Sequence, residues 1–336
     1  RAIFLVIIMD VDNQIIDESY CIFGAEALLN RLDALEKEIP GVMKSEDIEC
    51  VHRMRVASRR LRSAFLLFES CFPEDNIKKW KKQIRRVTRT LGKARDLDVQ
   101  IEFVKDFLTN VKESRYIPGI KRLVLRLQQK RQKVQIDVIS MLEKIQSNGT
   151  ISEIKNSLKS MLNTGLLHKK NEYSNYVYDM AYKEIESHID KFLFYERYIE
   201  DLNRIAELHL MRICAKRLRY TMEIFSPLYD NKLEKPIKIT REIQDLLGEI
   251  HDCFVWIEYL DQFIEEEKNR TLEYFGNTKA FSRLKAGLIH LQENRKKHQI
   301  KKHKEFLKFW EEIGADDVWK ETIKYVYNYS KKGEVL

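Results

Sequence analysis

Apolar side chains along residues 51–68 recur every three or four positions, the spacing that keeps them on one face of an α-helix. They are Val51, Met54, Leu61, Phe65 and Phe68. A second stripe, centred roughly 130° around the same helix, consists of His52, Arg55, Arg59 and Arg62. A helix that needed only solubility would interleave acids with these cations, because stacked like charges destabilise it. The stretch therefore predicts a helix with a core face and a separate face for an anion.

The same periodicity predicts helices through the rest of the first 150 residues. One covers about 20–38 and ends before Pro40-Gly41. The helix with the two stripes begins at Ser45 and ends at Phe72-Pro73. A third helix starts near Asp75, is interrupted around Gly92, and then continues to about 111. A fourth follows Pro118-Gly119 and continues to about 146, where Asn148-Gly149 predicts a turn.

The second half of the chain repeats the first. His209, Arg212, Lys216 and Arg219 repeat the cationic stripe at an offset of 157 residues. Residues 247–255, L-G-E-I-H-D-C-F-V, repeat residues 91–99, L-G-K-A-R-D-L-D-V, at an offset of 156, and residues 291–297 repeat 127–133 at 164. Three ordered matches at a nearly constant offset predict an internal duplication. Pseudo-two-fold packing of the halves would bring the two cationic faces together at one central basic groove.

The predicted architecture is all-α, with two tandem four-helix bundles related by a pseudo-two-fold axis. We expect a single domain over 20–332, after an N-terminal lead-in at 1–19 that fits either a short strand or irregular chain. The first helical half covers about 20–148 and the second about 171–332. Between them, a connector of about 149–170 is weakly helical and interrupted near 163–165.

Composition supports this fold class and narrows the cellular setting. Only 11 glycines and 5 prolines occur, and 33% of the residues are charged, which favours helices over turn-rich sheets. The cysteines are Cys21, Cys50, Cys71, Cys214 and Cys253. Their odd number, wide spacing and lack of a C-x-x-C pair predict reduced thiols in a cytoplasmic protein rather than a disulfide framework or a zinc site. The apolar run 2–9 is too short to span a bilayer, so we expect a soluble chain without a membrane partner. Because it begins at Arg1, we expect a piece of a longer protein.

The positive charge is concentrated in one part of the chain. Residues 51–95 contain fourteen Lys and Arg against three acids, a net charge of +11, whereas the whole chain has +8. The remainder therefore carries −3, and a local basic patch of this kind predicts a polyanion partner.

The duplicated motifs H-x-x-R-V-x-x-R-R-L-R and L-G-x-x-R-D-x-D-V resemble the CHAD family (conserved histidine α-helical domain). The resemblance covers roughly residues 20–330. It implies two four-helix bundles around a basic central surface that binds inorganic polyphosphate. We expect no cofactor and no catalytic residue. We expect a non-enzymatic module that serves localisation or scaffolding in the cytoplasm, at polyphosphate granules.

Carried over by position, the resemblance assigns polyphosphate binding to both stripes and to the basic face of the helix that follows each. These residues are His52, Arg55, Arg59, Arg62, Lys82, Arg85, Arg89, His209, Arg212, Lys216, Arg219, Lys238 and Arg241, with Lys78, Arg131 and Arg295 at the border. The second half departs from the pattern, because Glu234 and Asp245 replace the counterparts of Lys78 and Arg89. Residues 209–251 have a net charge of only +2. We therefore expect a lopsided site, with more affinity from the first half.

Two other classes of function stay open. A phosphoryl-transfer or phosphohydrolase enzyme, or its regulatory domain, would use the same anion contacts. No Walker-type motif is present, however, and no paired carboxylates are expected to hold Mg²⁺ beside the arginines. A nucleic-acid binder would suit the charge but lacks aromatic platforms in the stripes. His52 and His209 lack a His or Glu partner three or four residues later in the sequence, so no metal site is expected. Asp96, Asp98 and Asp252 are expected to cap helices or to orient the arginines through ion pairs.

Overall fold

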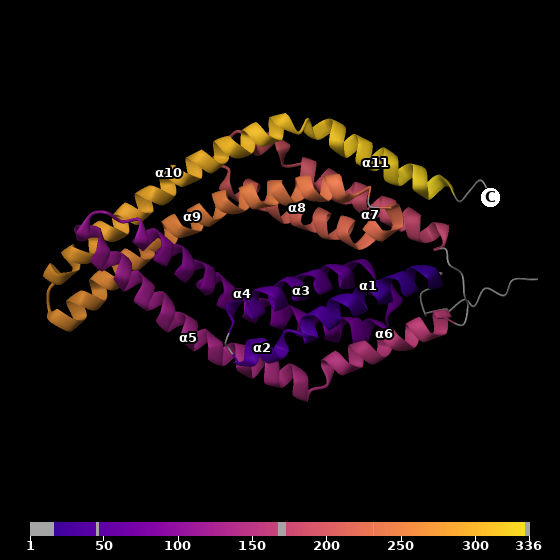
Figure 1. Cartoon of the computed structure of the whole chain (residues 1–336), viewed down its shortest axis with the longest axis horizontal. Coiled ribbons are helices and arrows are strands. Elements are labelled where there is room, and N and C mark those ends of the chain that lie inside the picture. Colours follow the sequence, from indigo (N-terminus) through magenta and orange to yellow (C-terminus); the bar gives the residue numbers. More distant parts are fainter. Residues whose placement is uncertain (1–16, 45–46, 167–172, 231, 333–336) are drawn as a thin grey trace, which may run out of the picture.

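The computed structural model describes residues 17–44, 47–166, 173–230 and 232–332, and every secondary-structure element in these ranges is a helix (Figure 1). The all-α prediction is therefore confirmed. The α-helices are α1 (Glu18–Glu36), α2 (Ile39–Lys44), α3 (Ile48–Leu67), α4 (Glu74–Thr109), α5 (Ile117–Ser147), α6 (Thr150–Leu166), α7 (Asn175–Leu193), α8 (Ile205–Phe225), α9 (Glu234–Phe275), α10 (Ser282–Glu312) and α11 (Ala315–Lys332). Short 3₁₀ turns are η1 (Glu69–Cys71), η2 (Ser114–Tyr116), η3 (Glu196–Tyr198), η4 (Ser226–Tyr229) and η5 (Lys279–Phe281). None of the helices in these ranges is long and apolar enough to cross a bilayer.

The order of helices repeats in the two halves. Helices α1, α3, α4, α5 and α6 are followed in the same sequence by α7, α8, α9, α10 and α11. The halves meet through equivalent helices, since α1 contacts α7, α3 contacts α8 and α5 contacts α10. An approximate two-fold relation between the halves produces contacts of this kind, because equivalent surfaces meet at the axis.

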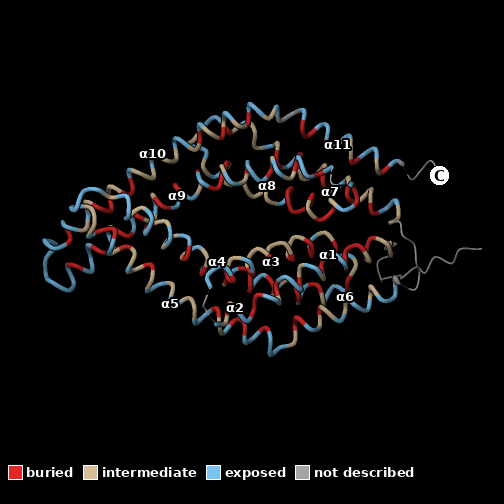
Figure 2. Tube along the Cα trace, viewed as in Figure 1, coloured by how far each residue is buried: buried red, intermediate tan, exposed pale blue. Residues whose placement is uncertain are grey.

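Buried apolar side chains form two clusters. The larger runs through α1, α3, α6, α7, α8 and α11, together with parts of the long helices, and it includes Trp80 and Trp319. The smaller cluster joins α4, α5, α9 and α10, which form an arm at the left of Figure 1. Leu127 and Leu291, the first residues of the third sequence match, are both fully buried in that arm. Because long helices of both halves share the arm, the prediction of two tandem bundles is not confirmed by this arrangement (Figure 2).

Several predicted breaks are wrong. Helix α4 continues without interruption through Gly92, as α9 does through Gly248. The first helix ends at Glu36, before Pro40-Gly41 as predicted, although these two residues themselves lie inside the short helix α2. The predicted connector is helix α6, which is unbroken at 163–165 and buries Ile154 and Leu158 in the main core. Tertiary packing outweighs the small intrinsic cost of these residues.

The predicted start of the chain and the predicted start of the second helix lie largely outside the described residues. The lead-in predicted for 1–19 lies outside the described residues except for its last three, where Asp17 caps α1 by accepting a hydrogen bond from the Tyr20 amide at 2.7 Å. The predicted start at Ser45 also lies outside them, and Asp47 caps α3 by accepting from the Glu49 amide at 2.8 Å.

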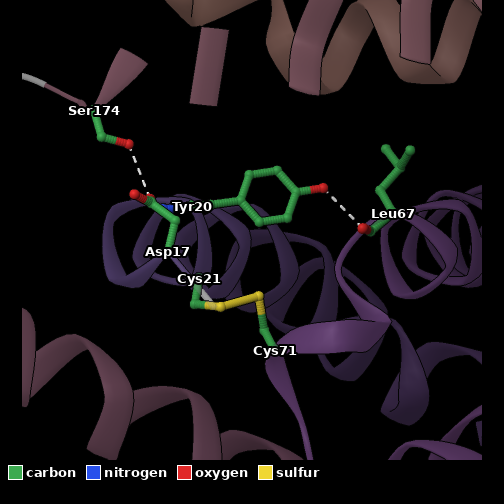
Figure 3. Close-up of a disulfide and its surroundings, with 6 residues drawn as sticks. All are labelled: Asp17, Tyr20, Cys21, Leu67, Cys71 and Ser174. Carbon is green, nitrogen blue, oxygen red and sulfur yellow. Dashed lines mark hydrogen bonds between the residues drawn. A yellow bond between two sulfur atoms is a disulfide. The ribbon is translucent and has the colours of Figure 1, made fainter. Parts of the chain in front are cut away.

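A disulfide joins Cys21 of α1 to Cys71 of η1, which corrects the prediction that all five cysteines are reduced (Figure 3). Their Cα atoms are 5.4 Å apart, within the usual range for a disulfide. The Tyr20 hydroxyl of α1 donates to the carbonyl of Leu67, the last residue of α3, at 2.8 Å and adds a second link close to the disulfide. Cys50, Cys214 and Cys253 are free. Spacing along the sequence could not reveal the pair, because 50 residues separate the two cysteines.

Candidate anion-binding site

The cationic faces of α3 and α8 meet where the two halves contact each other. The Arg59 Nη2 atom donates a hydrogen bond to the Tyr220 hydroxyl of the other half at 2.8 Å. Lys216 lies within electrostatic range of Arg55, Arg59 and Arg212. We call Arg55, Arg59, Arg212 and Lys216 the central cationic patch. The sequence prediction that both stripes reach one place holds for these four side chains.

The pKa of Lys216 reflects the concentration of positive charge at the central cationic patch. Burial, followed by the nearby charges of Arg59, Arg212 and Arg55, lowers its pKa to about 8. Burial also lowers the pKa of Arg55. Holding a charged lysine here therefore costs free energy, and an anion bound at the patch would remove that cost.

Two carboxylates accompany the arginines. Asp96 accepts a hydrogen bond from Arg55 Nη2 at 3.3 Å, as predicted for a residue that orients the row. Burial raises the pKa of Asp96 and of Asp252, while Arg55 and Arg212 oppose that rise, and Asp96 also acts on Asp252. The two carboxylates are therefore within electrostatic range of each other and of the arginines. Among the described residues, no group of three or more His, Cys, Asp and Glu side chains is arranged to hold a metal ion.

The two glycines of the repeated Leu-Gly motif leave room for the arginines. A Cβ atom built on Gly248 would lie 3.1 Å from Arg212 Nε and 3.2 Å from Arg212 Nη2. A Cβ atom on Gly92 would lie 3.6 Å from Arg55 Nε, an ordinary contact. Both glycines are in helix interiors, where glycine is otherwise unfavourable. The motif therefore lets a guanidinium lie flat against the neighbouring helix.

The motif histidines are half-buried beside the patch. Burial lowers the pKa of His52, and the charge of Arg95 lowers it further. The His209 ring stacks on His251 with centroids 3.8 Å apart, and burial and His209 lower the pKa of His251 to about 4. Neutral imidazoles at pH 7 can still donate hydrogen bonds to an anion. Arg95, the counterpart of His251, donates to Glu49 at 3.0 Å.

The helix that follows each stripe extends the positive surface. On α4 the predicted residues Lys82, Arg85 and Arg89 are exposed, and the charge of Arg85 acts on Arg62 of α3. On α9 the predicted residues Lys238 and Arg241 are also exposed. This surface therefore continues from Arg62 along the first half of the chain.

Other predicted residues lie elsewhere. Arg219 is buried and pairs with Glu223 of its own helix at 3.4 Å. Lys78 is exposed at the start of α4 and pairs with Glu74. Arg131 is held by buried Asp98 at 2.7 Å and by Gln135.

Arg295 is in the arm, where its guanidinium lies 4.2 Å from the centroid of the Phe103 ring. It lines a pocket between α4 and α10 together with Phe107 and His290. Arg131 and Arg295, which were predicted at the border of the site, are therefore both engaged by other side chains of the protein.

Tyr220, the residue that links the halves, was missed in the sequence. It follows the second stripe directly but is aromatic, and the first half has Ser63 in its place. The sequence signal that could have identified Tyr220 is the difference between the two repeats at the position directly after each stripe. Tyr220 is buried, with its hydroxyl bonded to Arg59, so it offers no free ring face for stacking.

Comparisons with known proteins agree with this fold. The model of the CHAD domain family matches residues 26–261. Two uncharacterized proteins of Mycobacterium tuberculosis, MT2285 of strain CDC 1551 and Rv2226 of strain H37Rv, are each 26% identical over 243 residues, which cover 66% of this chain. The match spans 41% of the length of each of those proteins.

Two solved structures share the fold. The crystal structure of the CHAD domain from the plant Ricinus communis has a TM-score of 0.59 and 23% sequence identity, and the match covers 82% of this chain and 87% of that one. PptA from Streptomyces chartreusis has a TM-score of 0.56 and 12% identity, with 87% of this chain and 99% of that one covered. Because the family model matches more than half of the sequence, this chain belongs to the CHAD domain family.

Proposed function

We propose that this chain binds inorganic polyphosphate at the central cationic patch and along the exposed cations of α4. The observation that carries the proposal is the convergence of four cations from two helices, with Lys216 held at a pKa of about 8 by burial and by its cationic neighbours. A ligand with closely spaced negative charges relieves that repulsion. Orthophosphate units joined in a linear chain have one charge per phosphorus and no base or sugar to be read.

The chemistry of the side chains fits such a ligand. Arginine presents paired donors to two phosphate oxygens, whereas lysine acts as a point charge. Successive positions of one stripe rise by about 5 Å on average, at 1.5 Å per residue, so neighbouring phosphates can meet neighbouring side chains. The cations of α4 continue this row away from the contact between halves. We further propose that the chain is a non-catalytic module that attaches its partners to cytoplasmic polyphosphate granules.

A titration tests the proposal against its two alternatives. Long-chain polyphosphate, single-stranded DNA and RNA are each titrated at about 150 mM salt, where screening suppresses weak surface attraction. We expect polyphosphate to bind more tightly than either nucleic acid. Equal affinity for DNA would contradict selectivity for polyphosphate.

A second assay addresses catalysis. Polyphosphate is incubated with the protein and Mg²⁺, and released orthophosphate is measured over time. No release above the uncatalysed rate is expected. Turnover that disappears in an Asp96→Asn variant would instead identify a phosphohydrolase that uses Asp96 and Asp252, the carboxylates beside the central cationic patch.

A further inference from the structure

A second group of arginines lies between the halves, apart from the central cationic patch. It consists of Arg31 of α1, Arg60 of α3, and Arg219 and Glu223 of α8, and we call it the seam cluster. Arg60 Nη2 lies 3.0 Å from Glu223 Oε2, and Arg219 Nη1 lies 3.4 Å from Glu223 Oε1. Arg31 is within electrostatic range of both Arg60 and Glu223. Three guanidinium groups share one carboxylate, so the cluster has a net charge of +2.

Tyr220 separates the seam cluster from the central patch. Its hydroxyl accepts the hydrogen bond from Arg59, while the Arg219 guanidinium lies 5.0 Å from the centroid of the same ring. Arg60 follows Arg59 in sequence but is about 100° further around α3. Arg31 belongs to α1, which contributes no residue to the central patch. An anion held by the seam cluster therefore occupies a different place.

The positive charge of this cluster is retained and incompletely paired. Burial and the charge of Arg60 lower the pKa of Arg31 to about 10, so the group stays protonated at neutral pH. Arg219 is only 8% exposed. Among the described side chains, the buried Nε atoms of Arg31, Arg60 and Arg219 and the Oε1 atom of Glu223 have no hydrogen-bond partner. Buried donors without partners are costly, and an oxyanion supplies acceptors for the three Nε–H groups, although not for the Glu223 oxygen.

The duplication preserves basic residue types at this side of the helices, although His188 is neutral at pH 7. At the offset of 157 residues, His188 corresponds to Arg31 and Arg217 to Arg60. Burial, followed by Lys191 and Arg217, lowers the pKa of His188 to about 4, so these groups are also neighbours. Leu66 stands where the second half has Glu223, and Arg217 is exposed. A basic pair between the first and second helix of each half is thus repeated, and the pair with Arg31 is joined by Arg219.

We propose that the seam cluster is a second anion site that takes a single phosphate-type oxyanion, either orthophosphate or the terminal phosphate of a chain. The three arginines supply forked donors, and Glu223 is a competitor that the anion displaces from Arg60. The Arg60 side chain is 39% exposed, so an anion can reach the cluster from solvent along it.

Thermal unfolding and calorimetric titration with orthophosphate test the proposal in the full chain. The wild type is expected to bind orthophosphate and to unfold at a higher temperature in its presence. Arg31→Met with Arg60→Met is expected to lose this binding. Arg115→Met with Arg283→Met is the matched control, because it also removes two arginines, both exposed and outside the seam cluster and the central cationic patch, and should retain the binding. No phosphate binding by the wild type, or equal binding by the Arg31/Arg60 variant, would overturn the proposal.

Glu223→Gln keeps the test decisive if the Arg31/Arg60 variant does not fold. Removing the competing carboxylate should tighten orthophosphate binding by about tenfold, which corresponds to one charge-assisted hydrogen bond of about 1.4 kcal/mol. Unchanged or weaker binding by Glu223→Gln would contradict the site. A purely structural cluster predicts lower stability and no gain in affinity.

The two sources of the phosphate are separated with linear tripolyphosphate and cyclic trimetaphosphate, which has no chain end. Tighter binding of the linear form, abolished by Arg31→Met with Arg60→Met, identifies the chain terminus as the occupant. Equal binding of orthophosphate and tripolyphosphate identifies free phosphate. The site does not rest on polyphosphate binding at the central patch, since failure there would leave the orthophosphate results unchanged.

Discussion

The two halves of the central cationic patch are built by equivalent helices but differ in charge. Arg55 and Arg59 of α3 are supported by α4, whose exposed face has Lys82, Arg85 and Arg89. Arg212 and Lys216 of α8 are supported by α9. There, Asp245 is the counterpart of Arg89, and Glu242 that of Arg86.

The comparison shows which features a duplicated scaffold keeps and which it loses. Both halves keep the glycine beside the arginine and the aspartate four residues later, Asp96 and Asp252, so the local geometry is retained. The charges have diverged, as His251 in place of Arg95 illustrates. Because the second half keeps the geometry with less positive charge around it, we still expect it to contribute less affinity, as predicted from the sequence.

The largest expected effect separates the halves directly. Arg55→Ala with Arg59→Ala should weaken polyphosphate binding by about 100-fold, equivalent to about 2.7 kcal/mol for two charge-assisted contacts. Arg212→Ala with Lys216→Ala should weaken it by only about tenfold. Both are measured by titration at one salt concentration, with Lys301→Ala and Lys308→Ala on α10 as a control of equal charge change. The reverse order would refute the lopsided site.

The next effect concerns the titration of Lys216. Its pKa of about 8 in the free protein means that it is charged below pH 8 and neutral above, and bound polyphosphate stabilises the charged form. Affinity should therefore fall by up to about tenfold between pH 7 and pH 9, since binding takes up one proton. Lys216→Arg should remove most of this decline. A decline of the same size in Lys216→Arg would assign the effect to another group.

A smaller effect distinguishes the two motif glycines. Gly248→Ala forces the Cβ atom against the Arg212 guanidinium and should weaken binding by about fivefold, or about 1 kcal/mol. Gly92→Ala meets Arg55 at an ordinary distance and should leave affinity unchanged. It should also raise the free energy of unfolding by about 0.5–1 kcal/mol, because alanine favours the helix. Equal losses of affinity in both variants would mean that the glycines do not serve to seat the arginines.

The smallest effect on binding is expected from the disulfide, which only the first half contains. The counterparts of Cys21 and Cys71 in the second half are Tyr178 and Leu228. Cys71→Ala should lower the free energy of unfolding by about 2–4 kcal/mol, the usual contribution of a disulfide, and should not change polyphosphate affinity. Denaturant unfolding and titration measure the two quantities, with Cys214→Ala as the control. Weaker binding in Cys71→Ala alone would show that the disulfide also shapes the site.

Helical spacing predicted most of the fold because apolar periodicity and the repeat are local properties of the sequence. It placed Arg55, Arg59, Arg212 and Lys216 together correctly, since equivalent faces of a duplicated chain meet at its axis. It could not predict that α4 continues through Gly92, because the packing of α4 against α3 around that glycine is not visible in the local spacing of the sequence.

The errors at the edges of the site have the same physical origin. Arg219 has the spacing of the stripe but is buried with Glu223, and Arg131 is held by Asp98. Sequence spacing specifies the face of a helix but not the neighbour that a long side chain meets. The disulfide was missed for a similar reason, because contact between Cys21 and Cys71 depends on how α1 packs near η1.

The salt dependence of polyphosphate affinity tests the central claim most directly. Each cation that neutralises a phosphate contributes about 0.7–0.9 to the slope of log K against log salt, by analogy with nucleic acids. Replacing Arg55, Arg59, Arg212 and Lys216 together by alanine should therefore reduce the magnitude of that slope by about 3. An unchanged slope would show that polyphosphate does not contact the patch between the two halves.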